Sequence, residues 1–234
     1  MKDSAAEDVY MSMKMTEYRI EIVRGHILVN DDRGSKVLID TGSPLSFHSD
    51  GVIALGGETF NVPTSLMGTG SGYVTENVGT DVDGLMGMDI LGNGVLIDVP
   101  NERIVLGHPT DCLTRVPSQS LFGYMVAEMD IRGRKAKVII DTGAPTSYVM
   151  PPLTDGLSAV DNVTDFNPMV PGGTFETPIF EFPVSFAGQR FDMRAGHLPF
   201  LIRATLSLLG VDGVIGMELL RRRPLLFADG GVWA

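Results

Sequence analysis

The sequence predicts an all-β protein of two similar lobes that share one site, and the first observation behind this is a stretch present twice. Residues 38–47 read L-I-D-T-G-S-P-L-S-F and residues 139–148 read I-I-D-T-G-A-P-T-S-Y, with six of ten positions identical. Asp141 follows Asp40 by 101 positions in a chain of 234 residues. An apolar run ending in Asp-Thr-Gly is typical of a buried strand that stops at a tight turn. Two copies at half-chain spacing predict that each lobe delivers one carboxylate to a common site.

A second repeated element supports this prediction. Residues 83–91 read D-G-L-M-G-M-D-I-L and residues 212–220 read D-G-V-I-G-M-E-L-L. Two apolar residues before a glycine suit a strand packed closely against another backbone, because glycine has no side chain to prevent the approach. The element begins 43 residues after Asp40 but 71 residues after Asp141. The second half therefore carries an insertion of 28 residues, which we expect within residues 175–207.

The remaining strands are predicted in matching places in the two halves. A strand pair with a Gly-containing turn precedes each D-T-G and is expected to support it from behind. A further strand pair, with a turn at Pro100-Asn101, closes the first half. These strands are predicted at residues 18–29, 37–39, 93–106, 124–129 and 137–140.

Together these motifs resemble those of the aspartic proteases of the pepsin and retropepsin type. That family carries D-T-G or D-S-G in each of two lobes or subunits, followed downstream by two hydrophobic residues and a glycine. The match consists of the two D-T-G stretches with the L-M-G ending at Gly87 and the V-I-G ending at Gly216. The resemblance implies a bilobal pepsin-like (acid protease) fold, with two retropepsin-like β-barrel lobes and a central cleft. The lobes are expected at residues 9–107 and 121–234, with a linker at residues 108–120.

The resemblance also implies an aspartic endopeptidase whose catalytic residues are Asp40 and Asp141. Two carboxylates that share one water cannot both ionise readily, because like charges raise one pKa and the pair titrates together. The ionised member would take a proton from the attacking water, and the protonated member would polarise the carbonyl and supply the leaving amine. We also expect Ser43 to hydrogen-bond Asp40 and favour its ionised form, since Ala144 lacks a hydroxyl. The supporting residues are Thr41, Gly42, Ser43, Thr142, Gly143 and Ala144, of which the family matches the threonines to a hydrogen-bonded pair.

Each half also contains a candidate flap, the hairpin that covers substrate in this family. Residues 66–73 (L-M-G-T-G-S-G-Y) begin 26 residues after Asp40, and their glycines suit a mobile hairpin tip. Residues 167–174 (N-P-M-V-P-G-G-T) begin 26 residues after Asp141. Pepsins have a tyrosine before G-T-G-S where this chain has Met67, and Tyr73 is a candidate for the missing hydroxyl. The predicted flap residues are Met67, Gly68, Thr69, Gly70, Ser71, Tyr73, Val170, Pro171 and Gly172.

Composition argues against several classes of function. A net charge of −11 is unsuited to nucleic acid, because phosphate binding requires a basic surface. The single cysteine, Cys112, excludes an internal disulfide, and no signal peptide or membrane span is visible, so we expect a cytoplasmic protein. The four histidines are scattered without ligand spacing, so no metal or other cofactor is expected. The expected partner is an extended peptide or unfolded protein, with no nucleic acid or membrane, bound by a monomer.

Two alternatives stay open. Asp-Thr-Gly alone can be a simple turn signal at the end of a strand, although the repeat and the downstream glycine elements weigh against this. The second alternative keeps the fold but not the activity, and makes the chain a non-catalytic peptide-binding or scaffolding module. Pro44 and Pro145 also depart from the pepsin pattern, where another Ser or Thr is common at this position.

Overall fold

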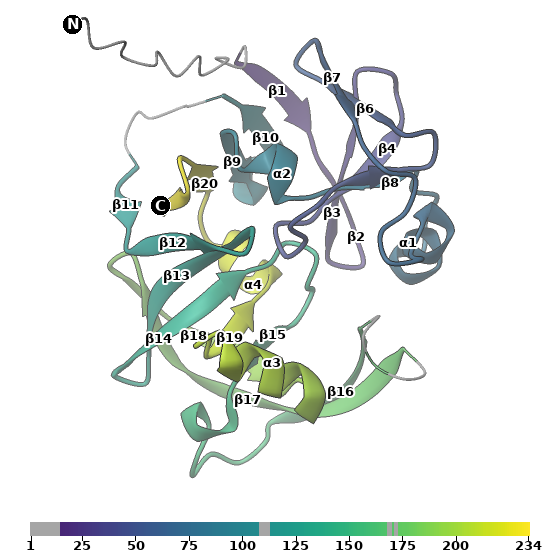
Figure 1. The fold of residues 1–234 in the computed structure, drawn as a ribbon. Coiled ribbons are helices and arrows are strands. Elements are labelled where there is room, and N and C mark those ends of the chain that lie inside the picture. Colours follow the sequence, from purple (N-terminus) through teal and green to yellow (C-terminus); the bar gives the residue numbers. More distant parts are fainter. Residues whose placement is uncertain (1–14, 108–112, 168–169, 171–172) are drawn as a thin grey trace, which may run out of the picture.

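A computed structural model describes residues 15–107, 113–167, 170 and 173–234. The chain forms two lobes of mostly β-structure, drawn in purple to blue and in teal to yellow in Figure 1. Among the described residues, no helix is both long and apolar enough to cross a membrane.

The first lobe contains a five-stranded sheet, a separate hairpin and two short helices. Its strand order is β2-β3-β4-β8-β5, in which β4 and β8 run parallel. Most residues of these two strands are fully buried, which explains why both read as continuous apolar runs. The elements are β2 (Glu21–Val23), β3 (His26–Asn30), β4 (Lys36–Ile39), β5 (Phe47–His48), β6 (Val52–Leu55), β7 (Glu58–Asn61), α1 (Ser71–Val78), β8 (Gly84–Met86) and α2 (Met88–Leu91).

The second lobe is a larger sheet of eight strands. Its order is β12-β13-β14-β19-β15-β18-β17-β16, and β14 and β19 again run parallel. The elements are β12 (Ser118–Leu121), β13 (Tyr124–Ile131), β14 (Arg134–Ile140), β15 (Ser147–Val149), η2 (Pro151–Leu153), β16 (Asp161–Phe166), β17 (Thr174–Phe186), β18 (Gln189–Gly196), α3 (Phe200–Leu208), β19 (Gly213–Ile215) and α4 (Met217–Leu220).

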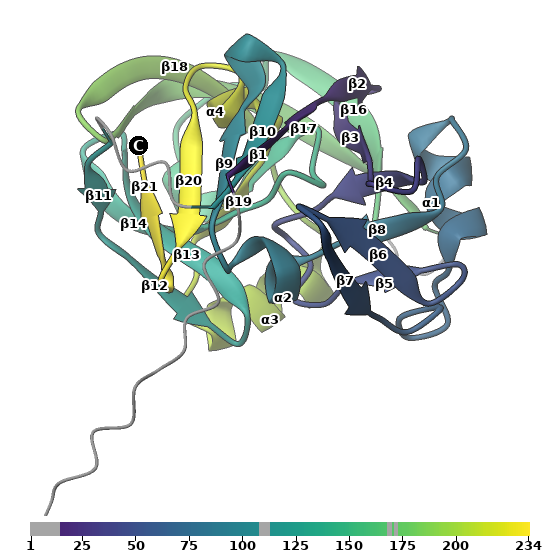
Figure 2. The ribbon, with the colours of Figure 1, turned by 90° about the horizontal axis from the view of Figure 1, so that it is seen from above.

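A third sheet joins the two lobes. Its order is β1-β10-β9-β20-β21-β11, so strands from the end of the chain pair with strands from the first half. Figure 2 shows β1, β10, β9 and β20 side by side. The elements are β1 (Thr16–Arg19), β9 (Val95–Asp98), η1 (Val99–Asn101), β10 (Arg103–Leu106), β11 (Arg115–Val116), β20 (Leu225–Ala228) and β21 (Gly231–Trp233). Of these strands, β10 ends before the predicted linker at residues 108–120 and β11 lies within it, while residues 108–112 lie outside the described part.

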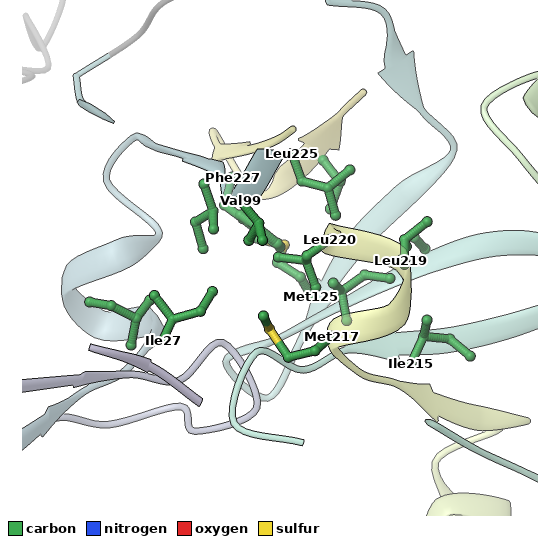
Figure 3. Packing of buried hydrophobic residues seen from close by; sticks show 14 of the residues in the cluster. Ile27, Val99, Met125, Ile215, Met217, Leu219, Leu220, Leu225 and Phe227 are labelled. Atoms are coloured by element: carbon green, nitrogen blue, oxygen red, sulfur yellow. The ribbon is translucent and has the colours of Figure 1, made fainter. Parts of the chain in front are cut away.

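The largest hydrophobic core also crosses from one lobe to the other. It includes Ile27 from the first lobe and Met125, Ile215 and Met217 from the second, all at most 3% exposed (Figure 3). Separating the lobes would expose this apolar surface to water, at a free-energy cost of roughly 25 cal/mol per Å². The core therefore holds the two D-T-G loops in a fixed mutual position.

The lobes differ in one hairpin. In the first lobe, β6 and β7 form a short hairpin, and α1 and β8 follow it. In the second lobe, β17 and β18 precede α3 and β19 in the same order, but an additional strand, β16, pairs with the first half of β17. The sheet of the second lobe thus continues beyond β15 with β18, β17 and β16, whereas the sheet of the first lobe ends at β5.

Candidate active site

The two D-T-G loops lie at the ends of equivalent parallel strands. β4 leads into Asp40 and β14 leads into Asp141. The Asp40 amide donates to the carbonyl of Met86 at 3.0 Å, and the Asp141 amide donates to the carbonyl of Ile215 at 2.9 Å. Each loop is thus attached to the second repeated element of its own lobe.

The two threonines form reciprocal hydrogen bonds across the lobe boundary. The Thr41 amide donates to Thr142 Oγ1 at 2.9 Å, and the Thr142 amide donates to Thr41 Oγ1 at 3.0 Å. Each hydroxyl donates in turn to a carbonyl of the opposite lobe, that of Ile140 at 2.8 Å and that of Ile39 at 2.7 Å. Both threonines are fully buried, and the amides and hydroxyls of the pair are all satisfied without water.

Each loop glycine lies against the aspartate of the other lobe. A Cβ at Gly42 would lie 2.2 Å from Asp141 Cγ, and a Cβ at Gly143 would lie 2.6 Å from Asp40 Cγ. Each glycine amide also donates to its own lobe's aspartate, at 2.9 Å for Gly42 and 2.8 Å for Gly143. Only glycine permits this approach, and it brings both carboxyl groups to one place.

The glycines of the second repeated element support the loops from behind. A Cβ at Gly87 would lie 2.5 Å from the carbonyl oxygen of Leu45, and a Cβ at Gly216 would lie 2.1 Å from that of Ala144. Their amides donate to Ser46 Oγ and Ser147 Oγ at 2.8 and 3.0 Å. The close backbone packing predicted for this element is therefore present in both lobes.

The leading aspartates of the same element cap the strand beside it. Asp83 accepts from the Lys36 amide at 2.9 Å and donates its own amide to the Lys36 carbonyl at 2.8 Å. Asp212 makes the same two bonds with Lys137, at 2.8 and 2.7 Å. These bonds fix the register of β8 on β4 and of β19 on β14.

The two carboxyl groups hydrogen-bond each other and share a site that disfavours two negative charges. Burial raises the pKa of Asp40 well above its usual value, and the charge of Asp141 raises it further. Burial also raises the pKa of Asp141, although the Gly143 amide and the Asp40 side chain oppose this. Both residues keep some accessible surface, but protein atoms surround the carboxyls closely enough for desolvation to dominate. The pair therefore retains one proton well above the pH at which an ordinary aspartate loses its own.

The expected bond between Ser43 and Asp40 is not formed. Ser43 Oγ donates instead to the carbonyl of Leu45 at 2.7 Å. The backbone amides of Ser43 and Ala144 face Asp40 and Asp141 alike, so position 43 gives Asp40 no additional donor. The expectation that Ser43 makes Asp40 the more readily ionised partner was wrong, because the Ser43 hydroxyl donates to the Leu45 carbonyl instead.

The glycine-rich stretch of the first lobe is a tight turn followed by a helix, and not the expected hairpin. Leu66 and Thr69 form an isolated bridge around Met67 and Gly68, and Gly70 precedes α1. Ser71 and Tyr73 lie within the helix. Met67 is fully exposed. Val74 and Val78 bury one face of the helix, and this four-residue spacing was the signal for a helix that the glycines obscured.

The second lobe does contain the expected hairpin, formed by β16 and β17. Their ladder runs from Asp161 opposite Ile179 to Phe166 opposite Thr174. Beyond the ladder, the Val170 amide donates to the carbonyl of Asn167 at 3.0 Å. Pro171 and Gly172 lie outside the described residues.

Sequence reasoning missed a pair of hairpin tips that reach across to the opposite D-T-G loop. A Cβ at Gly25 would lie 3.0 Å from Pro145 Cβ, and one at Gly123 would lie 2.7 Å from Pro44 Cβ. The two prolines that depart from the pepsin pattern thus form the surfaces on which these tips pack. The two tips share only a glycine in sequence, R-G-H at residues 24–26 and F-G-Y at residues 122–124, which is too little to mark them as a pair.

The side chains after these glycines lie near the carboxyl pair. By the strand register, Tyr124 falls opposite Asp141 and His26 falls opposite Asp40. Burial raises the pKa of Tyr124, and the charges of Asp141 and Asp40 add to this. Burial lowers the pKa of His26, while the charge of Asp165 opposes the shift.

No metal cluster marks this site within the described residues. No group of three or more His, Cys, Asp or Glu side chains in the described part is placed to hold a metal, and His108 and Cys112 lie outside that part. A hollow of about 430 Å³ lies elsewhere, between β1, β2, β3 and β4, with Arg19, Lys36 and Glu102 in its lining. The candidate site is therefore defined by the carboxyl pair.

The structure is similar to solved structures of pepsin-like proteins. An aspartic proteinase from Irpex lacteus superposes with a TM-score of 0.55 and 14% identity, over 94% of this chain and 97% of that chain. Basic 7S globulin from soybean superposes with a TM-score of 0.51 and 10% identity, over 94% of each chain. The protease of simian foamy virus (mac) covers 40% of this chain and 88% of its own, with 13% identity and a TM-score of 0.30. No family model and no curated protein matches the sequence.

These similarities and the observed topology define the class of the fold. The chain has an all-β, bilobal pepsin-like fold, as the sequence predicted. At 10–14% identity the likeness shows the fold alone.

Proposed function

We propose that the chain is an aspartic endopeptidase that hydrolyses peptide bonds through a water held between Asp40 and Asp141. The observation that carries this proposal is the contact of each loop glycine with the opposite aspartate, which brings the two carboxyls close enough to share one proton. A turn that only ended a strand would need neither the second carboxyl nor the threonine pair.

The chemistry follows from the shared proton. The ionised carboxylate takes a proton from the water as the water attacks the peptide carbonyl carbon, and the protonated carboxyl donates to the carbonyl oxygen. The intermediate collapses as the amine accepts the proton that was taken from water and the C–N bond breaks. One hydroxyl of the intermediate returns its proton to the other carboxylate, which restores the dyad. The backbone amides of Gly42 and Gly143 hold both carboxyls in place throughout.

The substrate we propose is an extended peptide or an unfolded protein segment lying between the lobes. The β16–β17 hairpin would cover it, with main-chain hydrogen bonds supplying affinity and apolar pockets choosing side chains. Both aspartates come from one chain, so the enzyme would act as a monomer. The proposed chemistry uses water and two carboxyls and requires no metal or other cofactor.

A second candidate is a peptide-binding module without catalysis. The similarity to basic 7S globulin supports this alternative, since that chain, which is named as a globulin, superposes over 94% of this chain, as the proteinase does. The intact carboxyl pair favours the enzyme.

Cleavage of an unfolded protein mixture across pH 3 to 8, with products located by mass spectrometry, distinguishes the two candidates. The enzyme predicts defined cuts that disappear in Asp40→Asn and Asp141→Asn. Cuts that survive both substitutions would remove the aspartic mechanism. Peptide binding by wild type with no cleavage at any pH would favour the binding module.

A further inference from the structure

Two neighbouring residues of β16 make contacts in opposite directions. Side chains alternate along a strand, so Asp165 and Phe166 point to different faces. Asp165 is bound by Tyr148 of its own lobe, and Phe166 contacts Tyr73 on α1 of the other lobe. Figure 1 shows β16 below α1, at the boundary between the lobes. This end of β16 therefore connects the second lobe to the first.

The bond on the second-lobe side is buried and charge-assisted. Tyr148 is 5% exposed, and its hydroxyl donates to Asp165 Oδ2. Burial raises the pKa of Tyr148, and the hydrogen bond and charge of Asp165 raise it further, so the hydroxyl remains a donor. The ring of Phe175, on the paired strand β17, lies 5.8 Å from the Tyr148 ring. Tyr148 therefore contacts both strands of the hairpin.

The contact on the first-lobe side is aromatic. The Tyr73 and Phe166 ring centroids lie 5.2 Å apart at an interplanar angle of 55°, a tilted geometry favourable for two aromatic rings. The Tyr73 hydroxyl is buried and has no hydrogen-bond partner within the described residues. Tyr73 therefore contributes its ring to the boundary, while its hydroxyl remains available to another donor or acceptor.

The equivalent position of the first lobe carries no hydroxyl. The repeated stretch ends in Phe47 in the first lobe and in Tyr148 in the second. Phe47 is also buried, but it carries no hydroxyl, and the sheet of its lobe ends at β5, whereas the second sheet continues past β15 to β16. The one chemical difference at this repeat position thus coincides with the presence of β16.

We propose that Tyr148 is a positioning residue that acts through Asp165, fixing where Phe166 meets Tyr73 and hence how closely the β16–β17 hairpin approaches a bound peptide. This inference rests on the proposed function, because the approach matters only if a peptide lies between the lobes. Tyr148 has no role in proton transfer in this account.

Hydrogen exchange of the free protein tests the positioning without substrate. Tyr148→Phe removes only the hydroxyl and should accelerate exchange of the β16–β17 ladder amides by about tenfold, the loss expected for one hydrogen bond to a charged group. Exchange in the β13–β14 ladder should be unchanged. Tyr18→Phe is the matched control, because the Tyr18 hydroxyl donates to Asp32 at 2.6 Å in the first lobe. That variant should leave both second-lobe ladders unchanged.

Cleavage kinetics on the same proteins test the consequence. Tyr148→Phe should raise KM by about tenfold, with a smaller change in kcat and no shift in the pH profile. Asp165→Asn retains an acceptor oxygen and should show a smaller rise in KM. The double variant Tyr148→Phe/Asp165→Ala should be no worse than Asp165→Ala alone, since both remove the same interaction.

The outcomes separate this inference from the proposed function. Faster β16–β17 exchange with a raised KM supports both. Faster β16–β17 exchange in Tyr148→Phe, together with a wild type that cleaves nothing, supports the positioning role of Tyr148 and overturns the proposed endopeptidase function. Unchanged exchange, or equal acceleration in both ladders, overturns the positioning role of Tyr148 even if wild type cleaves.

Discussion

Thr41 and Thr142, 101 residues apart in sequence, each donate a backbone amide to the other's hydroxyl. Each hydroxyl donates to a carbonyl of the opposite lobe, so four buried hydrogen bonds connect the two D-T-G loops. One loop cannot move without breaking bonds to the other. The relative position of the two carboxyls is therefore set by the lobe interface itself.

Removing one of these hydroxyls should destabilise the fold. Thr41→Val removes a hydroxyl that is both donor and acceptor, and it leaves the Thr142 amide buried without a partner. Each polar group left without a partner should lower the free energy of unfolding by about 1–3 kcal/mol. Thr41→Ser keeps the hydroxyl and should recover most of the loss. Thr205→Val is the control, because Thr205 donates to the Leu201 carbonyl on the exposed face of α3. Urea unfolding measures all three, and equal stability of Thr41→Val and wild type would show that these hydrogen bonds do not contribute to stability.

Gly42→Ala should reduce the rate of cleavage by about 100-fold. The added Cβ would lie 2.2 Å from Asp141 Cγ, so the carboxyl or the loop must shift, and a misplacement of about 1 Å can reduce the rate by about 100-fold. Gly72→Ala is the matched control, since a Cβ there meets nothing within 4 Å. Measurement of kcat/KM on one peptide substrate compares them. Comparable activity of Gly42→Ala and Gly72→Ala would contradict the close contact.

The carboxyl pair should also make stability depend on pH. Because the folded-state pKa of Asp40 is raised above 3.8, the folded state binds this proton more tightly than the unfolded state does. The resulting stability is present at low pH and is lost as pH rises through the folded pKa. Asp40→Asn stays neutral, so its melting temperature relative to wild type should increase between pH 4 and pH 7.5.

A carboxylate with the opposite shift provides the control for this pH dependence. Arg33 lowers the pKa of Asp50 to about 2, so the stability from Asp50 is present above about pH 4 and is lost as pH falls. Asp50→Asn should therefore lose melting temperature relative to wild type at pH 7.5 and regain it in acid. If both variants change in the same direction, the raised pKa of the carboxyl pair is not the cause.

The sequence was sufficient to predict the fold class and the elements around the carboxyl pair. Both D-T-G loops and both glycine-containing strands obey local constraints: a buried parallel strand must be apolar, and a backbone-to-backbone approach requires glycine. Gly87 and Gly216 illustrate this, since each would clash with a carbonyl oxygen if it carried a side chain. Such constraints are visible in a single sequence.

Other features depend on contacts between distant segments, and the sequence predicted them poorly. The glycines at residues 68–72 suit a hairpin tip as well as a turn before a helix, and packing of Val74 and Val78 decides for α1. The acceptor of the Ser43 hydroxyl is not readable from sequence, and only the folded loop shows that it is the Leu45 carbonyl. The contact between Phe166 and Tyr73 joins the two lobes and has no local signature.

Double-variant kinetics test the shared dyad most directly. In this account Asp40 and Asp141 act as one unit, so each single Asn variant should lower kcat/KM by at least about 1,000-fold, and the double variant should be no lower than the worse single variant. Thermal unfolding of each variant would confirm that the fold is retained. Near-wild-type cleavage by either single variant, or losses that multiply in the double variant, would contradict a water shared between the two carboxyls.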